Sequence, residues 1–599
     1  MSVHSNLKSP QMPTQSVITQ LGVRVPMRDG SSLHAVVWRP RGDVAPVSAV
    51  MELTPYGVDH LHEDGVFWAS EGFAYVALDV RGRGNSDGDF VPFLRDADDG
   101  YDAVEWIARQ PWCDGKVALH GGSYTGINQY LIMVAAPPSL CAITPDSTSG
   151  AGIDLPKGGV PSLYDLAWGR LVSNRATHFT IAGDVANWHR HLYDAAVTGQ
   201  SLVEVAVAAG APLEEFTMEH IDRAEPGPHW ERYWAQPEQL ASSSVPVLSI
   251  TGMYDDSSGG TIHNWRRFTA NASVDVVAAS HLVIGPWDHM GTHFGQGRVG
   301  ELTFGPEAVV KLAELRRDWL RHVLHGASAP EFLKNRVMLY VTGAERWLGV
   351  PSLEEAVAAH VTMYLHSVDG PMDSTHSGFI EAIAADGPDA VFVCDPFDMR
   401  THRAELETRP VGSGPESPFH GQPMNNFLMS LAGNDPTNPR PVADIDGQGV
   451  VYTSSVLAED ITILGEPQLH LRVVCDQPDA DLAVLLHEIT PHGDSIFLSS
   501  DLLRLSCRHR DGAHAYLVPG EPIDVTFQSF KWCQRTVRAG SRLRVAIRHA
   551  YALQLTPYAH GRPEDAAVAQ VRIQHAAGVA PRLMLPVASE AAEIGRAHV

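Results

Sequence analysis

The stretch Val117-Ala-Leu-His-Gly-Gly-Ser-Tyr-Thr-Gly126 decides the fold of this chain. Its apolar first part predicts a buried strand, which stops at two glycines that allow a sharp turn. Ser123 follows at once, and residues 124–135 have the apolar spacing of a helix. Strand, tight turn, serine and helix in this order predict a nucleophile elbow, which lifts the serine hydroxyl clear of the sheet edge. The match to Gly-x-Ser-x-Gly is incomplete because Thr125 holds the last position.

Two later strands end in the residue types that an activated serine requires. The run 247–254 leads into Asp255, and the run 281–288 leads into His289. Serine, acid and histidine follow one another in the α/β-hydrolase order. In this hypothesis His289 takes the Ser123 proton, while Asp255 fixes the imidazole tautomer and stabilises the imidazolium. The alternative is a core histidine beside a turn aspartate, which the position of all three residues at strand ends disfavours.

An oxyanion formed at Ser123 needs hydrogen-bond donors placed where the negative charge develops. The backbone N–H of Tyr124, directly after the serine, is the first candidate. No His-Gly-Gly-Gly stretch is present to supply a second donor. Tyr56 follows the third predicted strand, so its phenol is the second candidate, although a tyrosine there is more often a packing residue.

Composition limits the classes of function. The length of 599 residues predicts roughly two to four domains. A formal charge of −26 argues against nucleic-acid and anionic-membrane surfaces. Six cysteines without C-x-x-C spacing favour reduced thiols, so neither a metal nor another cofactor is expected. Residues 1–16 are polar and lack the apolar core of a signal peptide, so the cytoplasm is the expected location.

The pattern of predicted strands and helices changes along the chain. It predicts an α/β-hydrolase with a helical cap insertion and a C-terminal jelly roll. Strands alternate with helices at first, then a helical region with several aromatics interrupts them, and short β segments dominate from Arg336 onward. The strand at Val337–Val341 is interpreted as the first of the jelly roll. The predicted segments are 1–146 (α/β), 147–241 (cap), 242–335 (α/β), 336–592 (jelly roll) and 593–599 (a non-native tail).

Several motifs together resemble the cocaine-esterase and α-amino-acid-ester-hydrolase family, which belongs with the Xaa-Pro dipeptidyl-peptidase-like hydrolases. The resemblance covers about residues 18–550 and includes Pro55-Tyr56, Gly121-Gly-Ser-Tyr-Thr-Gly126, Gly252-Met-Tyr-Asp255 and Gly285-Pro-Trp-Asp-His289. The family elbow is Gly-x-Ser-Tyr-x-Gly, which accounts for Thr125. The resemblance implies the fold above, the Ser123–Asp255–His289 triad, and the Tyr56 hydroxyl as second oxyanion donor.

The substrate pocket is harder to predict than the triad. Asp256 and Ser257 directly follow the candidate acid, and the cap offers Trp168, Tyr164 and Trp188. The jelly roll offers one further aromatic, Phe419. Family members that act on α-amino acyl groups resemble one another in a carboxylate cluster, and no convincing cap carboxylate is apparent in this sequence. A neutral acyl group is therefore expected to be preferred.

The sequence thus predicts a serine hydrolase that cleaves a small acyl ester or amide through an acyl-enzyme. Two alternatives within the enzymes stay open, an Xaa-Pro dipeptidyl-peptidase and an α-amino acid ester hydrolase or acylase. A third reading, outside the enzymes, is a non-catalytic binding protein that uses its jelly roll. The expected partner is a small-molecule substrate, with no nucleic acid and no membrane, and the sequence leaves open whether the chain forms a homo-oligomer.

Overall fold

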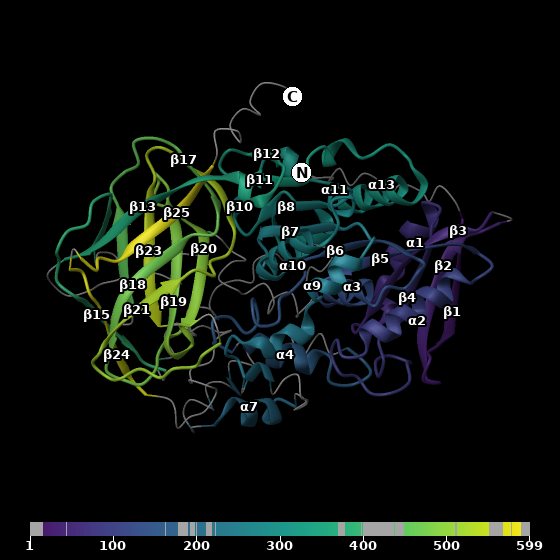
Figure 1. Cartoon of the computed structure of the whole chain (residues 1–599), viewed down its shortest axis with the longest axis horizontal. Coiled ribbons are helices and arrows are strands. Elements are labelled where there is room, and N and C mark those ends of the chain that lie inside the picture. The colour runs from purple at the N-terminus through teal and green to yellow at the C-terminus, as the bar shows by residue number, and fades with distance from the viewer. Residues whose placement is uncertain are drawn as a thin grey trace, which may run out of the picture.

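The computed structural model describes residues 16–588, with gaps at 43–44, 162, 178–189, 192–193, 195–197, 199, 211–218, 222, 369–377, 397, 399–436, 438–448, 510–511, 550–566 and 577. Two sheets dominate the molecule, a helix-covered sheet on the right of Figure 1 and a strand-rich region on the left. Within the described part of the chain, no helix combines the length and the apolar character needed to cross a bilayer.

The first sheet contains ten strands among the described residues, in the order β1-β2-β4-β3-β5-β6-β7-β8-β11-β12. From β4 to β11 neighbouring strands run parallel, while β1, β2 and β12 pair antiparallel at the two edges. The strands are β1 (Val17–Pro26), β2 (Ser32–Pro40), β3 (Val47–Thr54), β4 (Ala74–Asp79), β5 (Cys113–Gly122), β6 (Leu140–Asp146), β7 (Leu248–Tyr254), β8 (His281–Asp288), β11 (Val337–Val341) and β12 (Arg346–Val350).

Helices cover both faces of this sheet. Alternate strand residues face opposite sides, so neighbours such as Val50 and Met51 belong to two different apolar clusters. One cluster includes α2 (Asp96–Ala108), α3 (Tyr124–Val134) and α10 (Ser258–Asn271), and the other includes α1 (His62–Ser70) and α13 (Leu312–His325). The nearly continuous apolar strands of the sequence follow from this burial on both faces.

The sequence assigned one strand to the wrong sheet. Val337–Val341 was expected to begin the jelly roll, but it pairs in parallel with β8 and extends the first sheet, with β12 behind it. All five residues of β11 are buried. A short apolar run shows that a strand is buried on both faces, but it does not show which sheet the strand joins.

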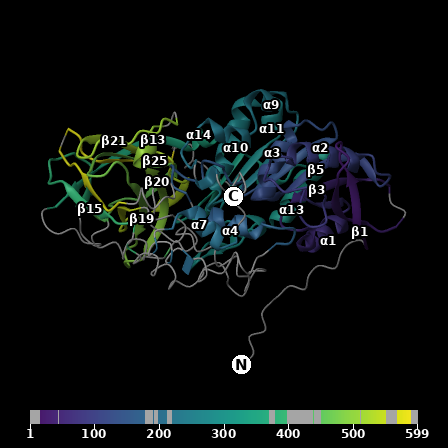
Figure 2. The same ribbon diagram turned by 90° about the horizontal axis from the view of Figure 1, so that it is seen from below.

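The segment between β6 and β7 is helical in its regular described elements. These are α4 (Leu163–Leu171), α7 (Leu202–Ala208), a 3-10 turn (Pro228–Tyr233) and α9 (Pro237–Ser242). Ser201 caps α7 and forms a reciprocal capping box with Glu204. In both views α4 and α7 lie near one another, between the strand-rich region and the first sheet (Figures 1 and 2).

The second sheet contains thirteen strands among the described residues, and its pairs are antiparallel apart from β14 with β16. Its own apolar cluster includes Leu365, Val473 and Leu485, none more than 4% exposed. The strands are β13 (Val357–Ser367), β14 (Gly378–Glu381), β15 (Ala390–Cys394), β16 (Gly449–Ser454), β17 (Ile461–Gly465), β18 (Gln468–Cys475), β19 (Asp481–Ile489), β20 (Ser495–Arg504), β21 (Pro522–Phe527), β22 (Cys533–Val537), β23 (Arg542–His549), β24 (Ala569–Ile573) and β25 (Arg582–Ala588).

Candidate active site

Ser123 is the single residue between β5 and α3, and its backbone conformation is strained. Its φ of 59° and ψ of −119° lie where few non-glycine residues are found. Gly121 has a φ of 130°, and a Cβ built on Gly122 would lie 2.0 Å from Asp146 Oδ1. Both glycines are therefore required by the turn, and the predicted strand–turn–serine–helix order is present.

Asp255 and His289 meet at the carboxyl ends of β7 and β8. Nδ1 of His289 lies 2.9 Å from Asp255 Oδ1. Because a carboxylate only accepts, Nδ1 carries the proton and Nε2 is left as an acceptor. The Thr251 hydroxyl and the Ser257 N–H also donate to Asp255, at 2.6 and 2.9 Å. This second set of bonds holds the fully buried carboxylate in place.

The two partners shift each other's pKa toward the charged forms. Burial opposes the charge of Asp255, but the His289 hydrogen bond and charge outweigh it and lower its pKa. Burial likewise opposes a charge on His289, yet the Asp255 hydrogen bond and charge raise the His289 pKa above its ordinary 6.5. The pair is therefore suited to hold an imidazolium, which a base beside a serine must become.

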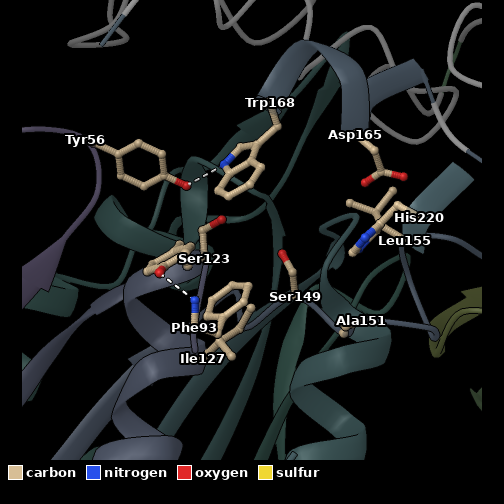
Figure 3. Close-up of a pocket in the computed structure, with 12 residues that line it drawn as sticks. Tyr56, Phe93, Ser123, Ile127, Ser149, Ala151, Leu155, Asp165, Trp168 and His220 are labelled. Carbon is tan, nitrogen blue, oxygen red and sulfur yellow. Dashed lines mark hydrogen bonds between the residues drawn. The ribbon is translucent and has the colours of Figure 1, made fainter. Parts of the chain in front are cut away.

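Tyr56 lies beside Ser123, as Figure 3 shows. The indole N–H of Trp168, from α4, donates to the Tyr56 hydroxyl oxygen at 3.2 Å. That bond uses the oxygen as an acceptor and leaves the phenolic proton to be donated elsewhere. Tyr124 is buried, with its ring stacked on Phe93 and its hydroxyl accepting from the Phe93 N–H at 2.9 Å.

A small cavity of about 50 Å³ opens on one side of Ser123. Figure 3 shows Tyr56 to the left of the serine, Trp168 above it, and Asp165, His220 and Leu155 to the right. The cavity is lined by Tyr56, Phe93, Ser123, Tyr124, Ile127, Ser149, Gly150, Ala151, Leu155, Asp165, Trp168 and His220. Asp165 lies on α4, in the segment predicted as the cap, where no convincing carboxylate was apparent from the sequence. Its position three residues before Trp168 on one helix was the signal for it.

A larger cavity of about 370 Å³ also reaches Ser123, and His289 lies in its wall. Its polar wall includes Glu52, Asp64, His120, His293 and Arg316, none of which the sequence analysis identified. Tyr75 donates to Glu52 at 2.7 Å, and burial raises the pKa of that carboxyl to about 8. Arg316 pairs with Asp146, whose Oδ2 also lies 3.3 Å from His293 Nδ1.

The substrate-binding residues expected from the sequence have mixed outcomes. Trp168 lines both cavities, whereas neither Asp256 nor Ser257 is among the described residues that line them. Asp256 is instead paired with Lys531 at 3.1 Å, and the Ser257 hydroxyl lies 2.6 Å from that of Ser149. The Tyr164 side chain, Trp188, Phe419 and the tail 593–599 lie outside the described residues.

One segment of the strand-rich region contacts the loop after β7 and the middle of β8. Lys531, just before β22, holds Asp256 next to Asp255. The Gln534 amide donates to the carbonyl oxygens of Ile284 on β8 and Tyr340 on β11, at 2.8 and 3.0 Å. Both contacts are mostly or fully buried. No sequence motif predicted these contacts, because the residues that each contact joins lie about 200 or more positions apart.

Two family models match the chain: X-Pro dipeptidyl-peptidase (S15 family) over residues 29–291, and X-Pro dipeptidyl-peptidase C-terminal non-catalytic domain over residues 335–577. The chain is 27% identical to cocaine esterase of Rhodococcus sp. (strain MB1 Bresler), over 81% of this chain and 83% of that one.

Solved structures share the fold. An aminopeptidase from a marine sediment Thaumarchaeota archaeon matches 98% of this chain and 99% of its own, with a TM-score of 0.77 and 20% identity. An α-amino acid ester hydrolase matches 98% and 100%, with a TM-score of 0.76 and 20% identity. The chain is a serine hydrolase of the esterase and peptidase type. Over most of its length it resembles the S15 family of hydrolases, first their catalytic part and then their C-terminal non-catalytic domain.

Proposed function

We propose that this hydrolase is an esterase in which Ser123, His289 and Asp255 form the catalytic triad. The observation that carries the proposal is geometric. A serine on a strained elbow and a histidine bonded to a buried aspartate line one cavity. In this proposal His289 Nε2 takes the serine proton as Oγ attacks the ester carbonyl. The imidazolium then protonates the departing alkoxide, and a water activated by the same histidine releases the acid.

The oxyanion of the tetrahedral intermediate is proposed to bind the Tyr124 N–H and the Tyr56 hydroxyl. In a nucleophile elbow the residue after the serine supplies the backbone donor, and Tyr124 follows Ser123 directly. The Tyr56 hydroxyl is a suitable second donor because Trp168 already uses its oxygen as an acceptor. Donors fixed in this way need no rearrangement when the charge develops.

The proposed architecture is an α/β-hydrolase core with a helical cap at 147–241 and a jelly roll at the C-terminus. The core takes in 1–146 and 242–335 and, because β11 and β12 belong to the first sheet, continues to about residue 350. The jelly roll then begins near β13 rather than at 336. A small-molecule ester is the proposed partner, and the cytoplasmic location stays a prediction.

A second candidate, an α-amino acid ester hydrolase, is favoured by Asp165 in the small cavity. A carboxylate there is suited to an ammonium group, whereas Asp256 is not among the described residues that line either cavity. Ethyl propionate and alanine ethyl ester differ only by the amino group, so their kcat/KM ratio separates the two functions. A preference for the alanine ester that Asp165→Asn abolishes would establish the amino-acyl function.

Labelling with a fluorophosphonate probe tests the proposal itself. The wild-type chain should be labelled covalently at Ser123, and Ser123→Ala should not be labelled. Ser139 is not among the described residues that line either cavity, so Ser139→Ala offers a matched control. Labelling that survives in Ser123→Ala would remove Ser123 from the mechanism.

A further inference from the structure

The two cavities that meet at Ser123 differ greatly in size. The small one measures about 50 Å³ and the large one about 370 Å³. Ser123, Tyr56 and Trp168 belong to the walls of both, so a substrate bound at the serine extends into each. An ester has two arms, an acyl arm and an alcohol arm, and the structure must assign one arm to each cavity.

The position of His289 decides the assignment. The histidine that removes the serine proton must return it to the oxygen of the leaving alcohol, so that oxygen has to face the imidazole. Among the described residues, His289 lines the large cavity and does not line the small one. The alcohol arm therefore lies in the large cavity, and the acyl arm points to the other side of the serine.

Volume then limits each arm. An apolar protein cavity of about 150 Å³ holds one benzene molecule. The small cavity has a third of that volume, so its walls enclose a chain of a few carbon atoms but not a whole ring. The large cavity has more than twice that volume, and Phe67, Trp68, Leu171 and Phe294 give it apolar walls. These walls suit a ring-bearing alcohol, whose burial removes apolar surface from water.

We propose that the preferred substrates are esters of a short-chain acid with a bulky, ring-bearing alcohol. This inference rests on the proposed esterase function and adds the substrate class to it. The reaction is balanced without a further reactant: Ser123 Oγ forms a bond to the acyl carbon, and the C–O bond to the alcohol breaks. His289 passes the serine proton to the alcohol oxygen, and water then releases the short acid.

Two isomeric esters test the assignment. Benzyl acetate and methyl phenylacetate contain the same atoms, but the first has its ring on the alcohol arm and the second on the acyl arm. With each rate divided by that of hydroxide-catalysed hydrolysis, kcat/KM should favour benzyl acetate by roughly 10-fold or more, since one misplaced methylene already changes kcat/KM by about 10–200-fold. An equal rate or a preference for methyl phenylacetate would overturn the inference.

Two variants act on the cavities separately. Ile127→Ala enlarges the small cavity and should lower the benzyl acetate preference by raising the rate with methyl phenylacetate. Ala313→Phe, on α13, narrows the large cavity and should lower the preference by slowing benzyl acetate. Arg472→Ala on β18, which is not among the described residues that line either cavity, is the control and should leave the ratio unchanged. A ratio that neither cavity variant alters would also overturn the assignment.

The outcomes distinguish this inference from the proposed function. Hydrolysis of neither isomer, together with no fluorophosphonate labelling of Ser123, contradicts the esterase function. Labelling of Ser123 with a reversed preference between the isomers leaves the function standing and contradicts only the placement of the two arms.

Discussion

Both sheets of this enzyme bury an apolar core, but they differ in whether their side chains line the cavities next to Ser123. At the carboxyl edge of the first sheet, polar residues on loops and strand ends surround two cavities next to Ser123. Among the described residues, the strand-rich region supplies none of the side chains that line these cavities. Among the described residues, its segment 531–534 contacts Asp256, beside Asp255, and the carbonyl oxygen of Ile284 on β8. A substitution in this segment should shift the positions of the catalytic residues and should not remove a reacting group.

The largest expected effect belongs to the first sheet. Ser123→Ala removes the attacking oxygen and keeps a residue with the same backbone requirements, so the chain should fold normally. Loss of a triad nucleophile costs on the order of 10⁶-fold in kcat. Ester hydrolysis and a thermal unfolding curve measure the two properties. Wild-type turnover in this variant would show that the elbow is only a turn.

Tyr56→Phe comes next. It deletes the proposed oxyanion donor and keeps the ring, so kcat should fall by about 100–1,000-fold while KM changes little. Trp168→Phe tests the contact that orients Tyr56, because it removes the bond donated to Tyr56 and leaves the phenol in place. Steady-state kinetics of both variants separates the roles. An unchanged kcat in Tyr56→Phe would make this tyrosine a packing residue.

Lys531→Met tests the contact between the two regions. Removing one partner of a buried ion pair costs about 3–5 kcal/mol, and the partial exposure of both side chains places this pair at or below the lower end. The free energy of unfolding, measured in urea, should fall accordingly, and kcat/KM should fall with it. Adding Asp256→Asn removes the unpaired charge and should restore much of both. A double variant no better than the single one would contradict a positioning role for the pair.

The pH dependence gives a smaller effect with a defined sign. His289 must be neutral to accept a proton, and Asp255 raises its pKa above 6.5. The acidic limb of kcat/KM should therefore have its midpoint above pH 6.5. The same shift contributes stability that is fully present below pH 6.5 and is lost as the pH rises through the folded-state pKa. Asp255→Asn should move any remaining acidic limb downward, and a limb that stays in place would contradict the pairing.

Arg472→Ala should have the smallest effect. Arg472 pairs with Asp524 at 3.4 Å on the surface of the second sheet, and Asp524 is 80% exposed. Exposed pairs contribute about 0–1 kcal/mol, so stability and kcat/KM should both stay close to wild type. A loss as large as that of Lys531→Met would show that the outer surface of the second sheet also affects catalysis.

The features that the sequence predicted well are those encoded by residues close together in the chain. The elbow is encoded within ten residues, and strand ends before Asp255 and His289 are visible as apolar runs, so the meeting of these two side chains was predictable. Their catalytic roles remain predictions. Tertiary contacts explain what was missed: Asp256 looked like a pocket residue until its partner Lys531, 275 residues away, was seen. The same limitation applies to β11, whose apolar run fits either sheet.

The bond from Gln534 to Ile284 also has a consequence for synthesis. Its two residues are 250 positions apart, and a ribosome adds about 5–20 residues per second. A nascent chain therefore carries β8 without its Gln534 partner for roughly 10–50 s. During that interval the strand that leads to His289 lacks one of its buried contacts, and the loop with Asp255 lacks Lys531. A mature active site thus reports that the chain has been made at least as far as Gln534 and that its two sheets have docked.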